Sequence, residues 1–221
     1  MSRANSEERA APDVLSHRVE KAFGADGALA AGSAWNDRPD QRAMAGEIAR
    51  AISEPSTLVA EAGTGIGKTF AYLVPALLAG GKVIISTGTK TLQDQLFARD
   101  LPRVIAALGV DVRTALLKGR ANYVCRHHLK RNLEDGRFTR AVDISRLRQI
   151  DRFSRLSSTG DRSDCSQVSD DDPAWVLATS TRENCLGQDC ADWNQCFVVQ
   201  ARRTAQSADV VVINHHLFSA D

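Results

Sequence analysis

The eight residues over 62–69, Ala-Gly-Thr-Gly-Ile-Gly-Lys-Thr, constrain the fold of this chain more than any other stretch. Three glycines at alternate positions allow the backbone to turn sharply and to direct successive N–H groups at phosphate oxygens. An apolar run over Thr57–Ala60 precedes them, and an apolar helical pattern over Lys68–Leu78 follows. Because phosphate-binding loops are built between a strand and a helix, this order predicts an α/β domain that binds a nucleotide.

Lys68 and Thr69 carry the chemistry expected of such a loop. The Lys68 ammonium is placed to reach the outer phosphates, and the Thr69 hydroxyl is placed to bind Mg²⁺. The N-terminus of the following helix adds partial positive charge. ATP and Mg²⁺ are therefore the expected cofactors. The alternative is a glycine-rich turn between a strand and a helix that has this sequence and binds no ligand. The remaining nucleotide contacts are expected from Gly63, Thr64, Gly65, Ile66 and Gly67.

Short apolar runs alternate with helical patterns around the loop. Strands are predicted over residues 57–60, 82–85, 111–117 and 209–213, and helices over residues 39–52, 68–78, 89–98, 102–108 and 197–208. A further amphipathic helix is predicted near the N-terminus. Strands that alternate with helices indicate a parallel sheet covered on both faces. The run Asp209–Ile213 is the most uniformly apolar, so it is predicted to be a central strand.

This alternation stops after Lys118. Residues 126–155 are helical in pattern, and residues 157–173 are rich in Ser and Asp. Between residues 118 and 162 there are twelve Lys or Arg and five Asp or Glu, whereas residues 163–196 hold one Arg and seven acids. This separation of basic from acidic residues predicts a basic surface that binds polyanions. The alternative is two solvated faces of a helical insertion. Because a strand pattern resumes afterwards, the whole stretch is predicted to be an insertion within one α/β domain.

The N-terminus lacks the apolar segment of a secretory signal. The longest apolar run, residues 70–79, is also far short of the about 20 residues that cross a bilayer. We therefore expect a cytoplasmic protein that does not enter a membrane. In a reducing cytosol, its five cysteines are expected to be metal ligands or free thiols rather than disulfides.

Four of the cysteines are spaced as metal ligands. Four residues separate Cys185 from Cys190, five separate Cys190 from Cys196, and Cys125 lies 59 residues upstream of Cys185. Structural zinc sites usually pair ligands through two to four residues, whereas iron–sulfur clusters are held at wider spacings. A cluster, a zinc ion and inert buried thiols all remain open on spacing alone. Cys165 has no partner at ligand spacing and is left out.

Two segments identify a family. Lys118-Gly119-Arg120-Ala121-Asn122-Tyr123-Val124-Cys125 and the ending over residues 208–218 resemble the iron–sulfur superfamily 2 DNA helicases of the XPD/DinG family, and the second is most similar to the YoaA/DinG branch. The resemblance covers residues 35–221. It implies a RecA-like P-loop parallel sheet, an incomplete first motor domain, with an inserted and mostly helical iron–sulfur domain. The implied boundaries are 1–34 (N-terminal helix and linker), 35–118 (motor domain), 119–196 (insertion) and 197–221 (return to the motor domain).

The resemblance also implies residue roles. Arg38 and Gln41 match the motif that reads adenine, and a side-chain amide can both donate to and accept from that base. The segment Ser86–Leu96 is similar to a motif that holds nucleic-acid phosphates at a strand–helix turn. The implied DNA contacts are Thr87, Thr89, Lys90 and Arg120, and the implied ligands of a [4Fe–4S] cluster are Cys125, Cys185, Cys190 and Cys196.

By resemblance, the function is that of an ATP-dependent 5′→3′ DNA helicase acting at junctions of single-stranded and duplex DNA in repair or replication. The implied partners are such DNA and replication or repair proteins, and the chain is expected to be monomeric. No Asp-Glu dipeptide, which would hold Mg²⁺ and orient water, occurs in the sequence. We therefore expect an N-terminal fragment that is inactive alone. The alternatives are a non-catalytic iron–sulfur protein that binds nucleotide and DNA, and a P-loop kinase or small ATPase with a zinc insertion.

Overall fold

A computed structural model describes residues 12–31, 36–135 and 141–218. The chain divides into two compact units. The first comprises the described residues within Met1–Thr114 and Ala208–Ile213, and the second those within Ala115–Ser207 and Asn214–Asp221. The described residues of the insertion predicted over 119–196 all belong to the second unit.

The described strands form a three-stranded sheet in the order β1-β3-β2. The strands are β1 (Val83–Thr87), β2 (Thr114–Leu117) and β3 (Val210–Asn214). The Val83 amide donates to the Asp209 carbonyl at 2.8 Å, and the Asp209 amide donates to the Arg113 carbonyl at 2.8 Å. All three strands therefore begin at the same edge of the sheet, as parallel strands do. The predicted α/β class with a parallel sheet is confirmed at this level.

β3 is the central strand, as its sequence predicted. Its residues 210–213 are all buried, with exposed fractions between 0% and 7%. Arg113 and Asp209 fix where this strand begins, because the guanidinium donates to both carboxylate oxygens at 2.8 and 3.1 Å and the Arg113 amide donates at 2.8 Å. These hydrogen bonds lower the pKa of Asp209 to about 2. The carboxylate is therefore charged at neutral pH and aligned beside the residue that precedes β2.

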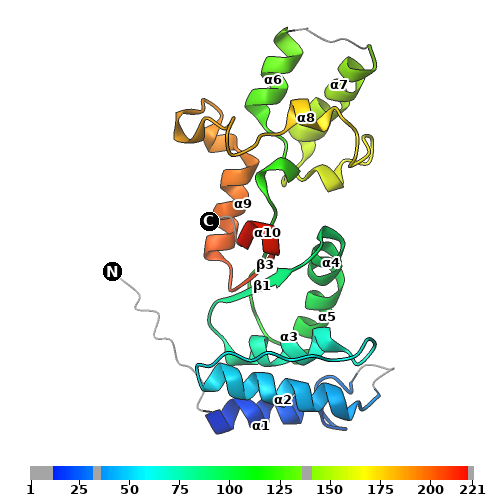
Figure 1. Ribbon diagram of the computed structural model, residues 1–221, viewed down its shortest axis with the longest axis vertical. Helices are drawn as coiled ribbons and strands as arrows, with labels where there is room; N and C mark the ends of the chain where they lie inside the picture. The colour runs from blue at the N-terminus through cyan, green and yellow to red at the C-terminus, as the bar shows by residue number, and fades with distance from the viewer. Residues whose placement is uncertain (1–11, 32–35, 136–140, 219–221) are drawn as a thin grey trace. The chain divides into compact units, whose positions relative to one another are not determined.

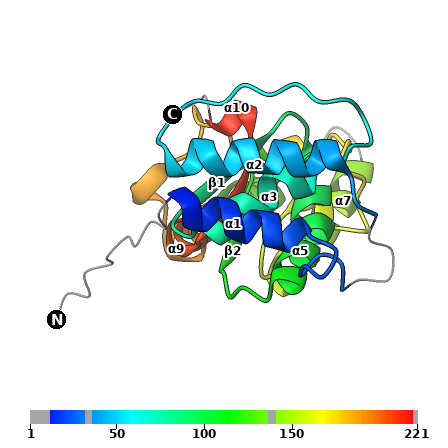
Figure 2. The same cartoon turned by 90° about the horizontal axis from the view of Figure 1, so that it is seen from below.

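Helices of the first unit pack in a group that carries the phosphate-loop residues. α1 packs against α2 and α3, and α2 packs against α3 (Figures 1 and 2). The buried faces of these three helices include Leu15, Phe23, Ala45, Ala49 and Leu73. The helices of this unit are α1 (Pro12–Phe23), α2 (Pro39–Ser53), α3 (Lys68–Ala79), α4 (Lys90–Gln95), a π-helical turn η1 (Leu96–Asp100) and α5 (Leu101–Leu108).

One strand prediction is wrong. Thr57–Ala60 is not a strand, and it runs as a loop alongside α2 (Figure 2). Leu58 is 40% exposed and Val59 is 92% exposed. An apolar run becomes a strand only where a neighbouring strand accepts its backbone hydrogen bonds, and the described sheet contains only β1, β3 and β2. The local pattern contained no information about that missing neighbour.

The second unit is mainly helical, as predicted for residues 126–155, of which residues 136–140 lie outside the described part of the chain. Its core consists of apolar side chains that include Leu129, Leu147, Ile150 and Trp175. None of the described helices in either unit is both long and apolar enough to span a bilayer. The helices of this unit are α6 (Arg126–Asp135), α7 (Ala141–Leu156), α8 (Trp175–Ala178), α9 (Phe197–Ser207) and α10 (His215–Phe218), with 3₁₀ turns η2 (Arg120–Asn122), η3 (Arg162–Asp164), η4 (Gly187–Asp189) and η5 (Trp193–Gln195).

Candidate nucleotide site and metal centre

The glycine-rich loop leads directly into α3. Gly65 and Gly67 have φ angles of 83° and 88°, in the left-handed region that favours glycine. Gly67 precedes the first residue of α3 and makes no side-chain cap. The loop residues are half-buried or exposed, so the N-terminus of α3 lies where an anion could reach it. The predicted phosphate-binding residues 63–69 therefore lie together on one loop and the first turn of one helix.

Two side chains of the Arg38–Gln41 motif hold this loop. The Arg38 guanidinium donates to the Gly65 carbonyl at 2.7 Å, and the Gln41 amide donates to the Gly67 carbonyl at 2.7 Å. Gln41 is buried whereas Arg38 is exposed. The structure thus places both residues against the loop, a contact that the sequence pattern did not indicate. Their role toward adenine stays a prediction.

The two residues expected to carry the chemistry are adjacent at the start of α3. The Lys68 ammonium donates to the Ala62 carbonyl at 2.6 Å and to the Gly63 carbonyl at 3.0 Å, so it is folded back over the loop. The Thr69 side chain hydrogen-bonds to Tyr72, whose pKa is raised above its ordinary value, mainly by burial. The Lys68 ammonium is therefore held close to the loop backbone, whereas the Thr69 hydroxyl is held by a side chain one turn further along α3.

A methyl group at Gly67 is expected to disrupt this loop. A Cβ at that position would lie 2.0 Å from Gln41 Nε2, and the left-handed backbone would strain any L residue. Gly67→Ala should therefore weaken binding of a fluorescent ATP analogue by at least about tenfold, the equivalent of about 1.4 kcal/mol. Gly46→Ala, in α2, is the matched control, because a Cβ there meets no atom within 4 Å and the residue lies outside the loop. Equal losses in both variants would contradict this reading.

Three of the four residues predicted to contact DNA, Thr87, Thr89 and Lys90, lie where β1 leads into α4. Thr87 Oγ1 lies 3.2 Å from the Thr89 carbonyl oxygen and 3.4 Å from that of Ile213. The Thr89 hydroxyl caps α4, since it accepts a hydrogen bond from the Leu92 amide at 3.2 Å. Lys90 is exposed at the first position of this helix. The turn therefore presents Thr89 and Lys90 to solvent, and their contact with DNA stays a prediction.

The four cysteines of the predicted ligand set line one cavity in the second unit. Its walls are mostly apolar and include Val124, Leu186, Trp193 and Val198 beside the four thiols. Cys165 does not line this cavity and is buried in the apolar core instead. The remaining polar lining comes from His127, His128 and Ser180. The structure thus brings Cys125, Cys185, Cys190 and Cys196 together.

Backbone hydrogen bonds carry these cysteines into place. The Cys125 amide donates to the Ala178 carbonyl at 2.7 Å, which ties the start of α6 to the end of α8. Cys190 and Cys196 each directly follow a 3₁₀ turn, and their amides donate back to Gly187 and Trp193. Each of these two thiols is therefore presented to the cavity by the 3₁₀ turn that directly precedes it.

The cavity disfavours thiolates that lack a counter-charge. Burial raises the pKa of Cys125, and repulsion from nearby Cys196 and Cys190 raises it further, against hydrogen bonds from the His128 amide and the Ser180 side chain. A bound metal would stabilise the thiolates instead. The Arg120 guanidinium already supplies one positive charge, since it donates to Cys185 Sγ at 2.8 Å. Arg120, which was predicted to contact DNA, is therefore placed against a candidate ligand.

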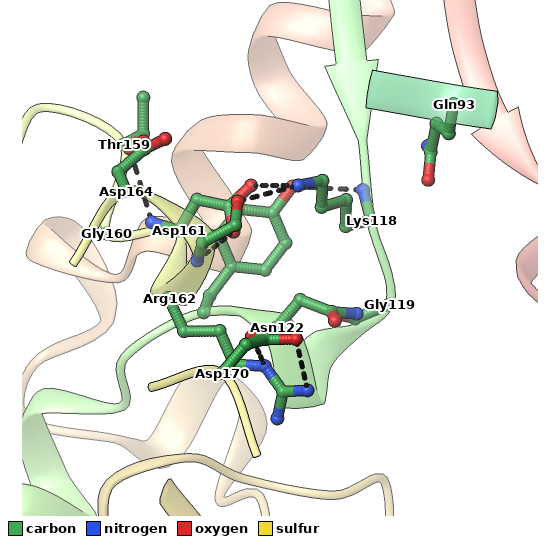
Figure 3. A network of polar contacts seen from close by, with 12 residues as sticks. Gln93, Lys118, Gly119, Asn122, Thr159, Gly160, Asp161, Arg162, Asp164 and Asp170 are labelled. Atoms are coloured by element: carbon green, nitrogen blue, oxygen red, sulfur yellow. Dashed lines mark hydrogen bonds and ion pairs between the residues drawn. The ribbon is translucent and has the colours of Figure 1, made fainter. Parts of the chain in front are cut away.

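A buried ion pair supports the segment that leads to Cys125 (Figure 3). Lys118 Nζ lies 2.7 Å from an Asp161 carboxylate oxygen, and the two side chains are only 4% and 9% exposed. Ser163 joins the pair: its hydroxyl accepts from Lys118 at 3.0 Å and donates to Asp161 at 2.8 Å. The Tyr123 hydroxyl accepts from the Lys118 amide at 3.0 Å. Sequence reasoning missed this network because its members are far apart along the chain.

Comparison with known proteins shows which helicases this chain is similar to. Residues 38–136 match the DEAD/DEAH box helicase family. The chain is 50% identical over 200 residues to the ATP-dependent DNA helicase YoaA of Escherichia coli, and 47% identical over 187 residues to that of Haemophilus influenzae. These alignments cover 90% and 85% of the chain but 31% and 29% of the relatives.

A more distant similarity points the same way. The chain is 35% identical over 206 residues to the ATP-dependent helicase DinG of Mycobacterium tuberculosis, an alignment that covers 83% of the chain and 31% of the relative. The chain therefore spans about a third of the length of the helicases it matches.

Proposed function

We propose that this chain, a relative of the YoaA and DinG helicases with a DEAD/DEAH box helicase domain, forms the nucleotide-binding part of an ATP-dependent DNA helicase that carries a [4Fe–4S] cluster. The observation that carries the proposal is the loop over residues 62–69, built in front of α3 with Lys68 and Thr69 at the helix start. By the resemblance, the whole protein moves 5′→3′ on single-stranded DNA and acts at junctions during repair or replication.

Nucleotide binding would use the loop as it stands. Gly63 and Gly65 leave open space beside the loop backbone for phosphates, and the N-terminus of α3 attracts negative charge. Lys68 would exchange its hydrogen bonds to the Ala62 and Gly63 carbonyls for phosphate oxygens, which are stronger acceptors because they are charged. The Thr69 hydroxyl would complete the shell of Mg²⁺.

Lys68→Ala is the test of this site. It is expected to weaken Mg²⁺–ATP binding about 10- to 100-fold, because one charge-assisted hydrogen bond contributes about 1.5–3 kcal/mol. Binding of a fluorescent ATP analogue to the 221-residue chain measures the effect. Arg103→Ala is the control, since it removes one exposed positive charge from α5. If both variants bind equally well, the loop is not a nucleotide site.

The cysteine cavity fits a [4Fe–4S] cluster by the chemistry of its donors. Four thiolates hold such a cluster, and four of the five cysteines line this one cavity. The cluster would supply a redox-active cross-link among Cys125, Cys185, Cys190 and Cys196. Arg120 would offset negative charge on Cys185, and the apolar walls would keep water from the thiolates.

Anaerobic purification tests the cluster directly. A brown protein with about four iron atoms and four labile sulfides per chain is expected, as the composition of a [4Fe–4S] centre requires. A colourless protein that holds one zinc ion and no sulfide would contradict the proposal. This measurement is independent of nucleotide binding, so each half of the proposed function can fail alone.

DNA would contact the turn between β1 and α4. Thr87, Thr89 and Lys90 are proposed to hold backbone phosphates, because hydroxyls, amides and lysines at a helix start bind phosphate without reading sequence. Arg120 is proposed as a second contact. Its guanidinium has five N–H donors, and those not used in the hydrogen bond to Cys185 would bind a phosphate.

A further inference from the structure

Three side chains of different chemical types converge beside the cysteine cavity. His127 comes from the first turn of α6, whereas Cys190 and Asp192 come from the tight turns between η4 and η5. Their possible ligand atoms all lie within 4.8 Å of one another, and each residue is half-buried. His127 and Cys190 also line the cavity itself. Only Cys190 belongs to the predicted cluster ligands.

This donor set suits zinc. Zn²⁺ takes thiolate, imidazole and carboxylate ligands in sites with three protein ligands and one open position. Ligand atoms bound at about 2.0–2.3 Å from one tetrahedral ion lie roughly 3.5 Å apart, so the present spacing closes with movements of about 1 Å. Cys190 and Asp192 lie on an irregular segment of turns, where the Trp193 amide donates to the Cys190 carbonyl at 2.9 Å. Such a segment can make that adjustment without disturbing a helix.

We propose that the cluster-free chain binds one Zn²⁺ through His127, Cys190 and Asp192, with water at the fourth position. Because Cys190 is also a candidate cluster ligand, an ion held there excludes the cluster. This competition rests on the proposed function, whereas the zinc site itself does not. The site makes the cysteine cavity a point of competition between zinc and iron–sulfur assembly.

Cobalt(II) is the spectroscopic probe for this site. Titration of the full cluster-free chain under reducing, anaerobic conditions is expected to saturate at one Co²⁺, with the visible bands of a four-coordinate ion and one thiolate-to-cobalt charge transfer. His127→Ala and Asp192→Asn should each weaken binding by at least about tenfold, since even the loss of an outer-shell partner of a metal ligand costs 10- to 100-fold. Excess Zn²⁺ should bleach the spectrum.

Cys185→Ser is the matched control. Cys185 lines the same cavity but lies outside the three-residue group, so its removal should leave cobalt affinity and spectrum unchanged. The proposal is overturned if Cys185→Ser weakens binding as strongly as Cys190→Ser while His127→Ala has no effect. That pattern would place the ion among the four thiols. His127→Gln keeps a polar side chain of similar size and should behave as His127→Ala does.

Competition is measured by cluster reconstitution with and without zinc. One equivalent of Zn²⁺ is expected to suppress incorporation of iron and sulfide into the wild-type chain, and Asp192→Asn should relieve that suppression. Zinc that suppresses both chains equally contradicts competition at this site. If the wild-type chain incorporates no cluster even without zinc, the proposed cluster is contradicted. The cobalt measurements on the His127 and Asp192 variants test the zinc site independently of that result.

Discussion

Asp161→Ala is expected to destabilise the second unit by about 3–5 kcal/mol, the cost of leaving a buried charge without its partner. The Lys118 ammonium lies 2.7 Å from this carboxylate and is almost fully enclosed. Removing Asp161 also takes an acceptor from the Ser163 amide and hydroxyl, which donate to it at 3.0 and 2.8 Å. The loss of free energy is a large part of the stability of an ordinary domain.

The local architecture explains why the effect should spread to the cysteine cavity. The Val124 amide donates to the Gly160 carbonyl at 2.8 Å, next to the ion pair, and Tyr123 forms an isolated antiparallel bridge with Asp161. Cys125 follows directly. Without the ion pair, the segment over residues 118–125 would lose its anchor to residues 160–163, so the position of the first thiol would loosen as well.

Chemical denaturation followed by tryptophan fluorescence measures this prediction, because Trp175 is in the core of the second unit. Glu134→Ala is the control: it removes a carboxylate from the exposed pair with Lys130, worth at most about 1 kcal/mol. The double variant Lys118→Met with Asp161→Leu should recover most of the lost free energy, since apolar side chains often replace a buried pair without cost. Equal midpoints for Asp161→Ala and Glu134→Ala would contradict the prediction.

Much of the fold followed from local patterns. The run over residues 209–213 predicted a central strand because a strand buried on both faces must be apolar at every position, and β3 is such a strand. Lys68–Leu78 was predicted as a helix from its apolar pattern, and α3 begins at the same residue and ends one residue later, at Ala79. The strand predicted over Thr57–Ala60 was wrong because pairing between strands is not a local property.

The contacts that shape the two sites could be predicted less well. Lys118 and Ser163 are 45 residues apart, and Arg120 and Cys185 are 65 apart, so no spacing rule joins them. The histidine beside Cys125 carried a weak signal: His127 lies two residues after a predicted ligand, and imidazole is a common metal ligand. Cysteine spacing indicated which four thiols could be ligands of one metal centre. The cavity that they share depends on folding of the whole second unit.

Cys125→Ser and Cys165→Ala are expected to have opposite effects. Cys125→Ser should abolish the cluster, with at least about a tenfold loss of absorbance near 400 nm and of bound iron, because one of four ligands is lost. The helical core should survive, since it is formed by contacts among apolar side chains that cannot bind a metal, including Leu129, Leu147, Ile150 and Trp175. This differs from a zinc finger, which unfolds when its ion is removed.

The damage in Cys125→Ser should therefore be local. Residues 181–196 contain only two short 3₁₀ turns and are mostly exposed, so hydrogen exchange there should become faster while α6 and α7 stay protected. Cys165→Ala should show the reverse, because Cys165 is 4% exposed within the core and does not line the cavity. It should keep the cluster and lose about 1 kcal/mol of stability to the small void. Loss of iron from Cys165→Ala, or retention in Cys125→Ser, would mean that the ligands have been assigned to the wrong cysteines.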